Sequence, residues 1–119
     1  MLKVLIDREN FAIARTDSLR EVEFFAAINY KGFTLVLREK EAEKMDCQEV
    51  EGGFKLITFD AKMDFSTVGF IAKISNALAE EEIPVLVFSS YFTDHLLIRE
   101  EHLEKAIEVF EKLGFEVET

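Results

Sequence analysis

With 119 residues, 49% of them hydrophobic, the chain is long enough for one compact domain or for two small halves that share a core. Its formal net charge of −10 at pH 7 argues against nucleic acid and against a membrane surface as partners, because binding to phosphates needs clustered Lys and Arg. The single cysteine, Cys47, excludes an intramolecular disulfide and a zinc site made of cysteines.

The first half of the chain predicts a small unit that is rich in strands. Its clearest turn signal is Lys31-Gly32, which lies between two apolar runs and predicts a hairpin. We expect, in chain order, strands over 2–6 and 11–14, a short turn or helix over 17–23, hairpin strands over 24–30 and 33–37, a helix start over 39–44 and a link over 47–53.

The second half predicts a fuller unit with two helices. Pro84 stops a helix and opens the next strand, and Gly114 ends a second helix. We expect a strand over 54–59, a helix from Asp64 or Ser66 to about Glu82, strands over 85–88 and 96–98, an amphipathic helix carrying Leu103, Ala106, Ile107 and Phe110, and a final strand over 115–118. This β-α-β-β-α-β order is the ferredoxin-like arrangement of the α+β class.

Two stretches of the sequence are nearly alike. Residues 35–44 (LVLREKEAEK) align with residues 96–105 (LLIREEHLEK) at an offset of 61 residues, 96 minus 35. Each reads as an apolar strand followed by a charged helix start. The repeat predicts tandem halves with antiparallel sheets, of which the first, residues 1–53, is reduced and the second, residues 54–119, is complete.

Three strands are continuous apolar runs rather than alternations: 35–37, 85–88 and 96–98. Such runs predict burial on both faces of the sheet. A ferredoxin-like sheet carries helices on one face only, so the other face must meet the sister half or a second chain. We therefore expect a homodimer.

Nothing in the sequence predicts export or insertion into a membrane. No apolar run approaches the roughly 18 residues of a membrane span. The start, MLKVLID, is too short and too soon charged for a secretory signal. We expect a cytoplasmic protein.

No enzyme constellation is visible. Cys47 has no histidine near it in the sequence, His95 and His102 are not spaced as metal ligands, and no Gly-rich phosphate motif occurs. We read His95 as an exposed or half-buried strand residue and His102 as a surface residue. We expect no catalytic residue, no metal and no cofactor, and an unrecognised enzyme of this fold stays open as a third possibility.

Two polar segments are candidates for a binding site. Residues 64–69 (DFSTVG) begin the first long helix, where unpaired backbone N–H groups and the helix dipole favour an anion. Residues 89–94 (SSYFTD) offer hydroxyls, an aromatic ring and the Asp94 carboxylate. Together they suit a zwitterion, and an amino acid is the simplest ligand of that kind. The alternatives are helix capping with close packing at Gly69, and an ordinary turn in which Tyr91 packs.

The motifs DFSxxG at 64–69 and SYxTDxLLI at 90–98 resemble the small ACT-domain proteins related to the CASTOR-type arginine sensors. The resemblance implies an ACT fold, with residues 1–53 as a degenerate ACT-like half and 54–119 as the ACT domain. By position, it implies that Gly69, Ser90, Tyr91 and Asp94 contact the ligand, with Thr93 near the tip. The unpaired N–H groups expected at the helix start add Ser66, Thr67 and Val68 as candidate contacts.

The resemblance implies a non-catalytic regulator that binds an amino acid between ACT units and reports occupancy through assembly or partner binding. The eukaryotic sensors have four ACT units and this chain has two at most, so a comparable site implies a dimer. The second hypothesis is a ligand-free interaction module that assembles through its apolar sheet. Substituting Asp94 would then leave assembly unchanged, whereas a charge at Val87 or Leu97 would break it.

Overall fold

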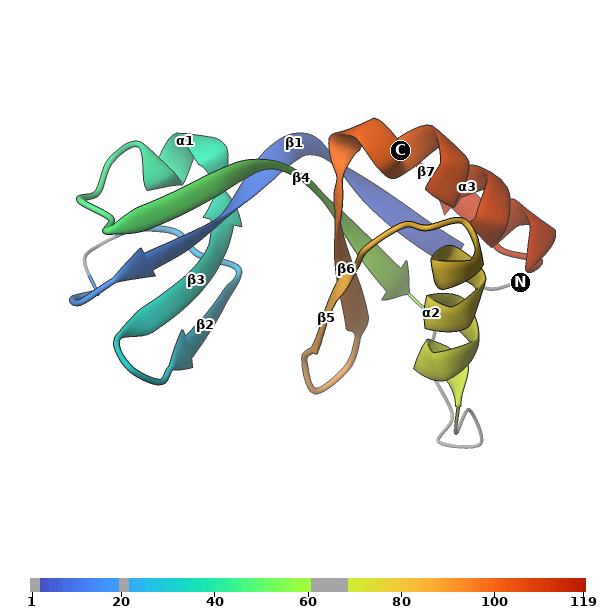
Figure 1. Cartoon of the computed structure of the whole chain (residues 1–119), viewed down its shortest axis with the longest axis horizontal. Helices are drawn as coiled ribbons and strands as arrows, with labels where there is room; N and C mark the ends of the chain where they lie inside the picture. The colour runs from blue at the N-terminus through green and yellow to red at the C-terminus, as the bar shows by residue number, and fades with distance from the viewer. Residues whose placement is uncertain (1–2, 20–21, 61–68) are drawn as a thin grey trace. The chain divides into compact units, whose positions relative to one another are not determined.

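The computed structural model describes residues 3–19, 22–60 and 69–119, and the chain divides into two compact units. The large unit consists of Met1–Arg8 and Lys55–Thr119, and the small unit consists of Glu9–Phe54. Two strands, β1 (Lys3–Thr16) and β4 (Glu49–Asp60), contribute residues to both units (Figure 1). The small unit is therefore an insertion within the sequence of the large one.

β1 is one strand of 14 residues, where the sequence predicted two shorter strands. The polar run at 7–10 predicted a break between them. In the structure the backbone stays extended through this run, and Lys55 Nζ donates to the Arg8 carbonyl at 3.0 Å. An extended backbone tolerates polar residues wherever their side chains reach solvent, as all four do here in whole or in part.

The strand order of the small unit is β2–β3–β1–β4. β2 (Ala26–Asn29) and β3 (Phe33–Arg38) form the predicted hairpin, whose turn has left-handed backbone at Lys31 (φ 51°) and Gly32 (φ 89°). α1 (Glu39–Ala42) is a single helical turn. One buried cluster of this unit joins three alanines to two leucines: Ala12, Ala14, Ala42, Leu35 and Leu37.

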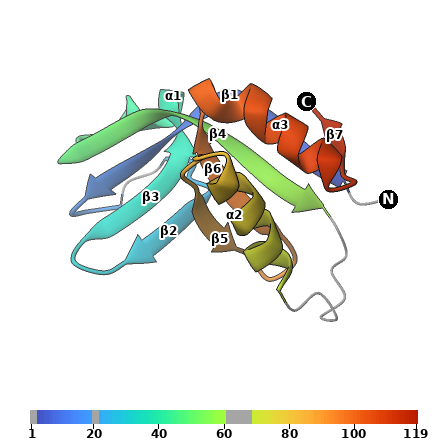
Figure 2. The ribbon, with the colours of Figure 1, turned by 45° about the vertical axis from the view of Figure 1, so that its right-hand side comes forward.

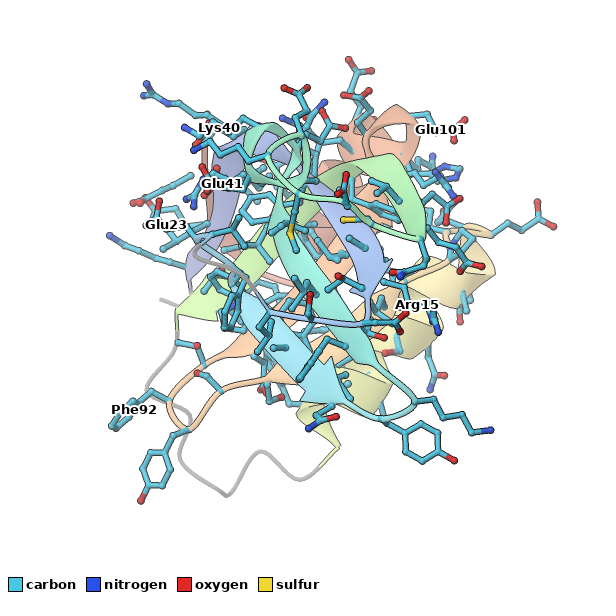
Figure 3. The ribbon with its side chains drawn as sticks, turned by 90° about the vertical axis from the view of Figure 1, so that its left-hand side faces the viewer. Arg15, Glu23, Lys40, Glu41, Phe92 and Glu101 are labelled. Carbon is cyan, nitrogen blue, oxygen red and sulfur yellow. The ribbon has the colours of Figure 1, made fainter. Side chains whose placement is uncertain are left out.

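The segment between β1 and β2 contains no helix in its described residues, 17–19 and 22–25. It is held instead by Glu41 of α1, whose carboxylate is buried. One oxygen accepts from the Glu23 N–H at 3.1 Å and the other from Lys44 Nζ at 2.7 Å. Figure 3 shows Glu23 and Glu41 close together.

The large unit has the predicted β-α-β-β-α-β order, which confirms the ferredoxin-like α+β fold. Its strands lie in the order β1–β4–β6–β5, the β5–β6 pair is antiparallel, and β7 pairs in parallel with β1. After β4 the elements are α2 (Phe70–Glu80), β5 (Leu86–Ser89), β6 (Asp94–Arg99), a 3-10 turn over Glu100–His102, α3 (Leu103–Lys112) and β7 (Glu116–Glu118).

The core of the large unit lies between α2, α3 and one face of the strands (Figure 2). Phe59 of β4 is at its centre, fully buried, with its ring centroid 5.4, 5.6 and 5.5 Å from those of Phe70, Phe110 and Phe115. Alternate strand residues complete this core with the apolar faces of the helices: Val4, Ile6, Ile57, Ile74, Leu78, Leu96, Ile98, Ala106 and Val109.

Two of the three continuous apolar runs are buried as predicted, and the third is not. Residues 35–37 and 96–98 are buried. In the run at 85–88, Leu86 and Val87 are 42% and 38% exposed, because β5 is the last strand in the sheet order of the described residues. The prediction of burial on both faces is therefore wrong for β5.

Candidate ligand site

The predicted ligand-binding residues belong to two segments of the large unit. Residues 66–68 lie outside the described part of the chain, and Gly69 directly precedes α2. Ser90, Tyr91, Thr93 and Asp94 belong to the tip, residues 89–94, where β5 turns into β6. Figure 1 shows the start of α2 and this tip at the same, lower end of the large unit.

Gly69 has a left-handed backbone, with φ 89°, and no side chain caps the described start of α2 there. A Cβ built on Gly69 would meet no atom of the described residues within 4 Å. Close packing against Gly69 is therefore not seen among residues 3–19, 22–60 and 70–119. The left-handed backbone at this position favours glycine.

The tip is held in one conformation by its own polar groups. Ser89 pairs with Asp94 across the hairpin, and Ser89 Oγ donates to Asp94 Oδ1 at 2.5 Å. The Ser90 N–H donates to the Thr93 carbonyl at 2.9 Å, and Ser90 Oγ accepts from the Thr93 N–H at 3.0 Å. These bonds keep the Asp94 carboxylate partly exposed at the base of a fixed turn.

The aromatic residues of the tip lie in solvent. Tyr91 and Phe92 are 92% and 80% exposed, and their ring centroids are 4.8 Å apart. Figure 3 shows Phe92 pointing away from the ribbon. The alternative that Tyr91 packs into the fold is therefore wrong, and the pair of rings is available to a ligand or to a partner surface.

His95 follows the tip, and its burial differs from the sequence prediction of an exposed or half-buried strand residue. It is only 4% exposed, because it lies on the strand face that also carries the buried Leu97. Its Nδ1 is 2.9 Å from Thr58 Oγ1 on β4, its Nε2 is 2.7 Å from Thr93 Oγ1, and its ring stacks on Phe88 at 5.3 Å between centroids. The period-2 alternation of Thr93, His95 and Leu97 was the signal that could have predicted this burial.

Burial lowers the pKa of His95 below its ordinary value of 6.5, and the neighbouring Asp94 carboxylate opposes the shift in part. The unfolded chain takes up a proton near pH 6.5 that the folded chain resists, so the free energy of unfolding falls as the pH drops below about 6.5. We expect the Tm to fall between about pH 7.5 and 5.5, and to fall less in His95→Gln. Thermal melts at constant ionic strength measure this, and equal slopes in the two proteins would contradict it.

Four cavities in the described residues have linings that do not include the tip. Two of them, of about 410 and 440 Å³, lie in the small unit and both include Val50. A third, of about 120 Å³, lies beside the first turn of α2 at Phe70 and Lys73. The tip itself is an exposed surface, with Tyr91 and Phe92 in solvent.

The described residues contain no group of three or more His, Cys, Asp and Glu side chains that could hold a metal ion. Burial, together with the charge of Asp46, raises the pKa of the Cys47 thiol, away from the range of a reactive thiolate. In the same part of the chain, no helix has the length and apolar character needed to cross a membrane.

Residues 49–112 match the family model of the ACT domain, which is 64 of 119 residues (112 − 49 + 1). No protein with a curated description matches the sequence. Among solved structures, the protein Atu0741 from Agobacterium tumefaciens has a TM-score of 0.83 at 20% identity, over 98% of this chain and 92% of that one.

Structures of aspartate kinase subunits are similar as well. A structure of aspartokinase alpha and beta subunits has a TM-score of 0.71 at 18% identity, over 92% of this chain and 95% of that one. The regulatory subunit of aspartate kinase from Thermus thermophilus has a TM-score of 0.69 at 12% identity, over 92% of this chain and 94% of that one. At these identities the likeness shows the fold alone.

Proposed function

Because the chain belongs to the ACT domain family, we propose that it is a regulatory protein that binds a small amino acid-like ligand and catalyses no reaction. The fold that it shares with regulatory subunits of aspartate kinase supports this role. A relation to the CASTOR-type arginine sensors is a finer proposal, which rests on the motifs at 64–69 and 90–98. We propose a cytoplasmic location.

The observation that carries the proposal is the tip, which offers a partly exposed carboxylate and an exposed aromatic ring on a fixed turn. Asp94 takes the ligand's ammonium group or a basic side chain, and Tyr91 covers its apolar part. The backbone N–H groups around residues 67–69 take the ligand's carboxylate. The proposed set of contacts is Ser66, Thr67, Val68, Gly69, Ser90, Tyr91, Thr93 and Asp94.

A second ACT unit completes the site in this proposal, supplied by a second copy of the chain in a homodimer. The strand β5, with Leu86 and Val87 exposed, offers apolar surface to that copy. Residues 1–53 are proposed to be a degenerate ACT-like half and 54–119 the ACT domain. The boundary between the two compact units lies between Phe54 and Lys55, and residues 1–8 belong to the same compact unit as Lys55–Thr119.

A thermal-shift screen against the twenty amino acids, one at a time at millimolar concentration, tests ligand binding. A ligand at 100 times its Kd stabilises the folded state by about 2.7 kcal/mol, which raises the Tm by several degrees. We expect such a shift with one or two amino acids only. No shift with any of them would overturn the proposed amino acid ligand.

The exposed apolar edge of β5 supports a second candidate, the ligand-free interaction module. In either case Val87→Glu should weaken self-association at least about tenfold, because a charge would be buried at the contact. Sedimentation equilibrium measures this, with Val50→Glu as the matched control, since Val50 is 52% exposed in the small unit. Unchanged association in Val87→Glu would remove β5 from the contact. Leu97 is unsuitable because it is 1% exposed within the single chain, so that a charge there would test folding.

A further inference from the structure

A continuous line of hydrogen-bonding side chains runs from the interior of the large unit to the tip. Thr58 Oγ1 is 2.9 Å from His95 Nδ1, His95 Nε2 is 2.7 Å from Thr93 Oγ1, and Thr93 Oγ1 is 2.7 Å from Ser90 Oγ. The imidazole at its centre is buried and stacked on Phe88, so that its orientation is fixed by packing. The line ends at Ser90, which is exposed and belongs to the proposed ligand contacts.

The direction of every bond in this line depends on which ring nitrogen carries the proton. A neutral imidazole donates from one nitrogen and accepts at the other. With the proton on Nδ1, Nε2 accepts from the Thr93 hydroxyl, and Ser90 must then donate its own hydrogen to Thr93 Oγ1. In this state the Ser90 hydrogen is used inside the tip.

With the proton on Nε2, the Thr93 hydroxyl no longer has to donate to the ring. Nε2 donates to Thr93 Oγ1 and Thr58 donates to Nδ1, so that the Thr93 hydrogen becomes available to Ser90 Oγ, which also accepts from the N–H groups of Thr93 and Phe92 at 3.0 and 3.3 Å. The Ser90 hydrogen is then released from Thr93 Oγ1, and its nearest acceptor within the tip is the Thr93 carbonyl at a long 3.4 Å. A carboxylate oxygen of a ligand would be a better acceptor for it.

We propose that His95 is a positioning residue that sets, through Thr93, whether Ser90 donates a hydrogen bond to the carboxylate or other acceptor atom of a bound ligand. His95 does not touch the ligand itself. The inference rests on the proposed amino acid site, and its first step, the coupling of His95 to Ser90, belongs to the free protein. Ligand binding selects the Nε2–H tautomer, and the free protein favours Nδ1–H.

Nitrogen-15 NMR of the imidazole separates the two neutral tautomers and tests the coupling without any ligand. We expect His95 in the free wild-type chain near pH 7.5 to be neutral and mainly Nδ1–H. Ser90→Ala removes the hydroxyl partner of Thr93 in both states, so the ratio of the two His95 tautomers should change. Unchanged ring nitrogen shifts in a folded Ser90→Ala protein would overturn the proposal.

Two isosteric variants separate positioning from mere structural support. Thr93→Val and Thr58→Val each remove one hydroxyl partner of the same ring. Thr93→Val disconnects Ser90 from the ring, so the tautomer of His95 should no longer respond to the ligand or to Ser90→Ala. Thr58→Val removes the hydroxyl that accepts from Nδ1–H, which favours Nε2–H and should leave ligand binding unchanged or tighter. A tautomer that still responds to the ligand in Thr93→Val, or weaker binding in Thr58→Val, would contradict a positioning role.

The ligand step uses a mixture of the twenty amino acids at about 1 mM each as the probe. A raised Tm together with a shift of His95 toward Nε2–H supports the proposal. A raised Tm without any change in the tautomer overturns it and leaves the proposed function standing. No change in Tm overturns the proposed function and the ligand step with it, and the Ser90→Ala comparison still decides the coupling.

Discussion

Replacing Phe59 by alanine should lower the free energy of unfolding of the large unit by about 3–5 kcal/mol, the range measured for buried aromatic residues. The side chain is fully buried, and its ring makes edge contacts with Phe70, Phe110 and Phe115. Phe110 belongs to α3, and Phe70 is the first residue of α2. The cavity would therefore loosen the start of α2, next to Gly69.

Chemical denaturation of wild type and Phe59→Ala measures this loss. Phe59→Leu is the matched control, because leucine refills part of the space and should lose about half as much stability or less. Phe11 is not used as the control: its side chain is as fully buried as that of Phe59, but it lies in the small unit. A loss below about 1 kcal/mol in Phe59→Ala would contradict the central place given to this ring.

Replacing Asp94 by alanine should weaken amino acid binding by about 1.5–3 kcal/mol, or roughly 10- to 150-fold, which is the size of a charge-assisted hydrogen bond. The carboxylate is partly exposed at the base of the tip, and the structure gives it one neutral partner there, Ser89 Oγ at 2.5 Å. Its charge is thus available to a ligand cation. Isothermal titration with the amino acid found by the thermal-shift screen measures the loss.

Two further variants show whether the charge of Asp94 is responsible. Asp94→Asn keeps the shape and the bond to Ser89 but removes the charge, so it should lose nearly as much affinity as Asp94→Ala. Ser89→Ala keeps the charge and removes only its neutral partner, so affinity should stay within about threefold of wild type. Full affinity in Asp94→Ala would show that this residue does not hold the ligand.

Elements whose pattern is local were predictable from the sequence. The apolar positions Ala106 and Phe110 gave the inner face of α3, and Gly114, with φ 95°, ends that segment as expected. The hairpin around Lys31-Gly32 was equally clear, because few residues adopt two successive left-handed conformations. In each case the residues that decide the structure, a pair of turn residues or regularly spaced apolar residues, lie within a few positions of one another in the sequence.

Features that depend on distant residues were not predictable in the same way. The apolar run at 85–88 reads like the buried run at 96–98, but β5 is the last strand in the sheet order of the described residues, and that order decides its exposure. The tip residues of the candidate site follow from the motif. The hydrogen bonding of His95 does not, because its partner Thr58 is 37 residues away in the sequence.

The shared strand β1 makes the order of folding differ from the order of synthesis. Val4 pairs with Val117 of β7, 113 residues further on (117 − 4), and packs into the core of the large unit. The beginning of β1 is thus synthesised long before its partner β7, and such distant pairing slows folding, whereas residues 11–16 of the same strand pair with the nearby β3. The contiguous small unit is complete much earlier. Exchanging it for another domain would require two matched junctions, after Arg8 and before Lys55, and a single cut would release neither unit intact.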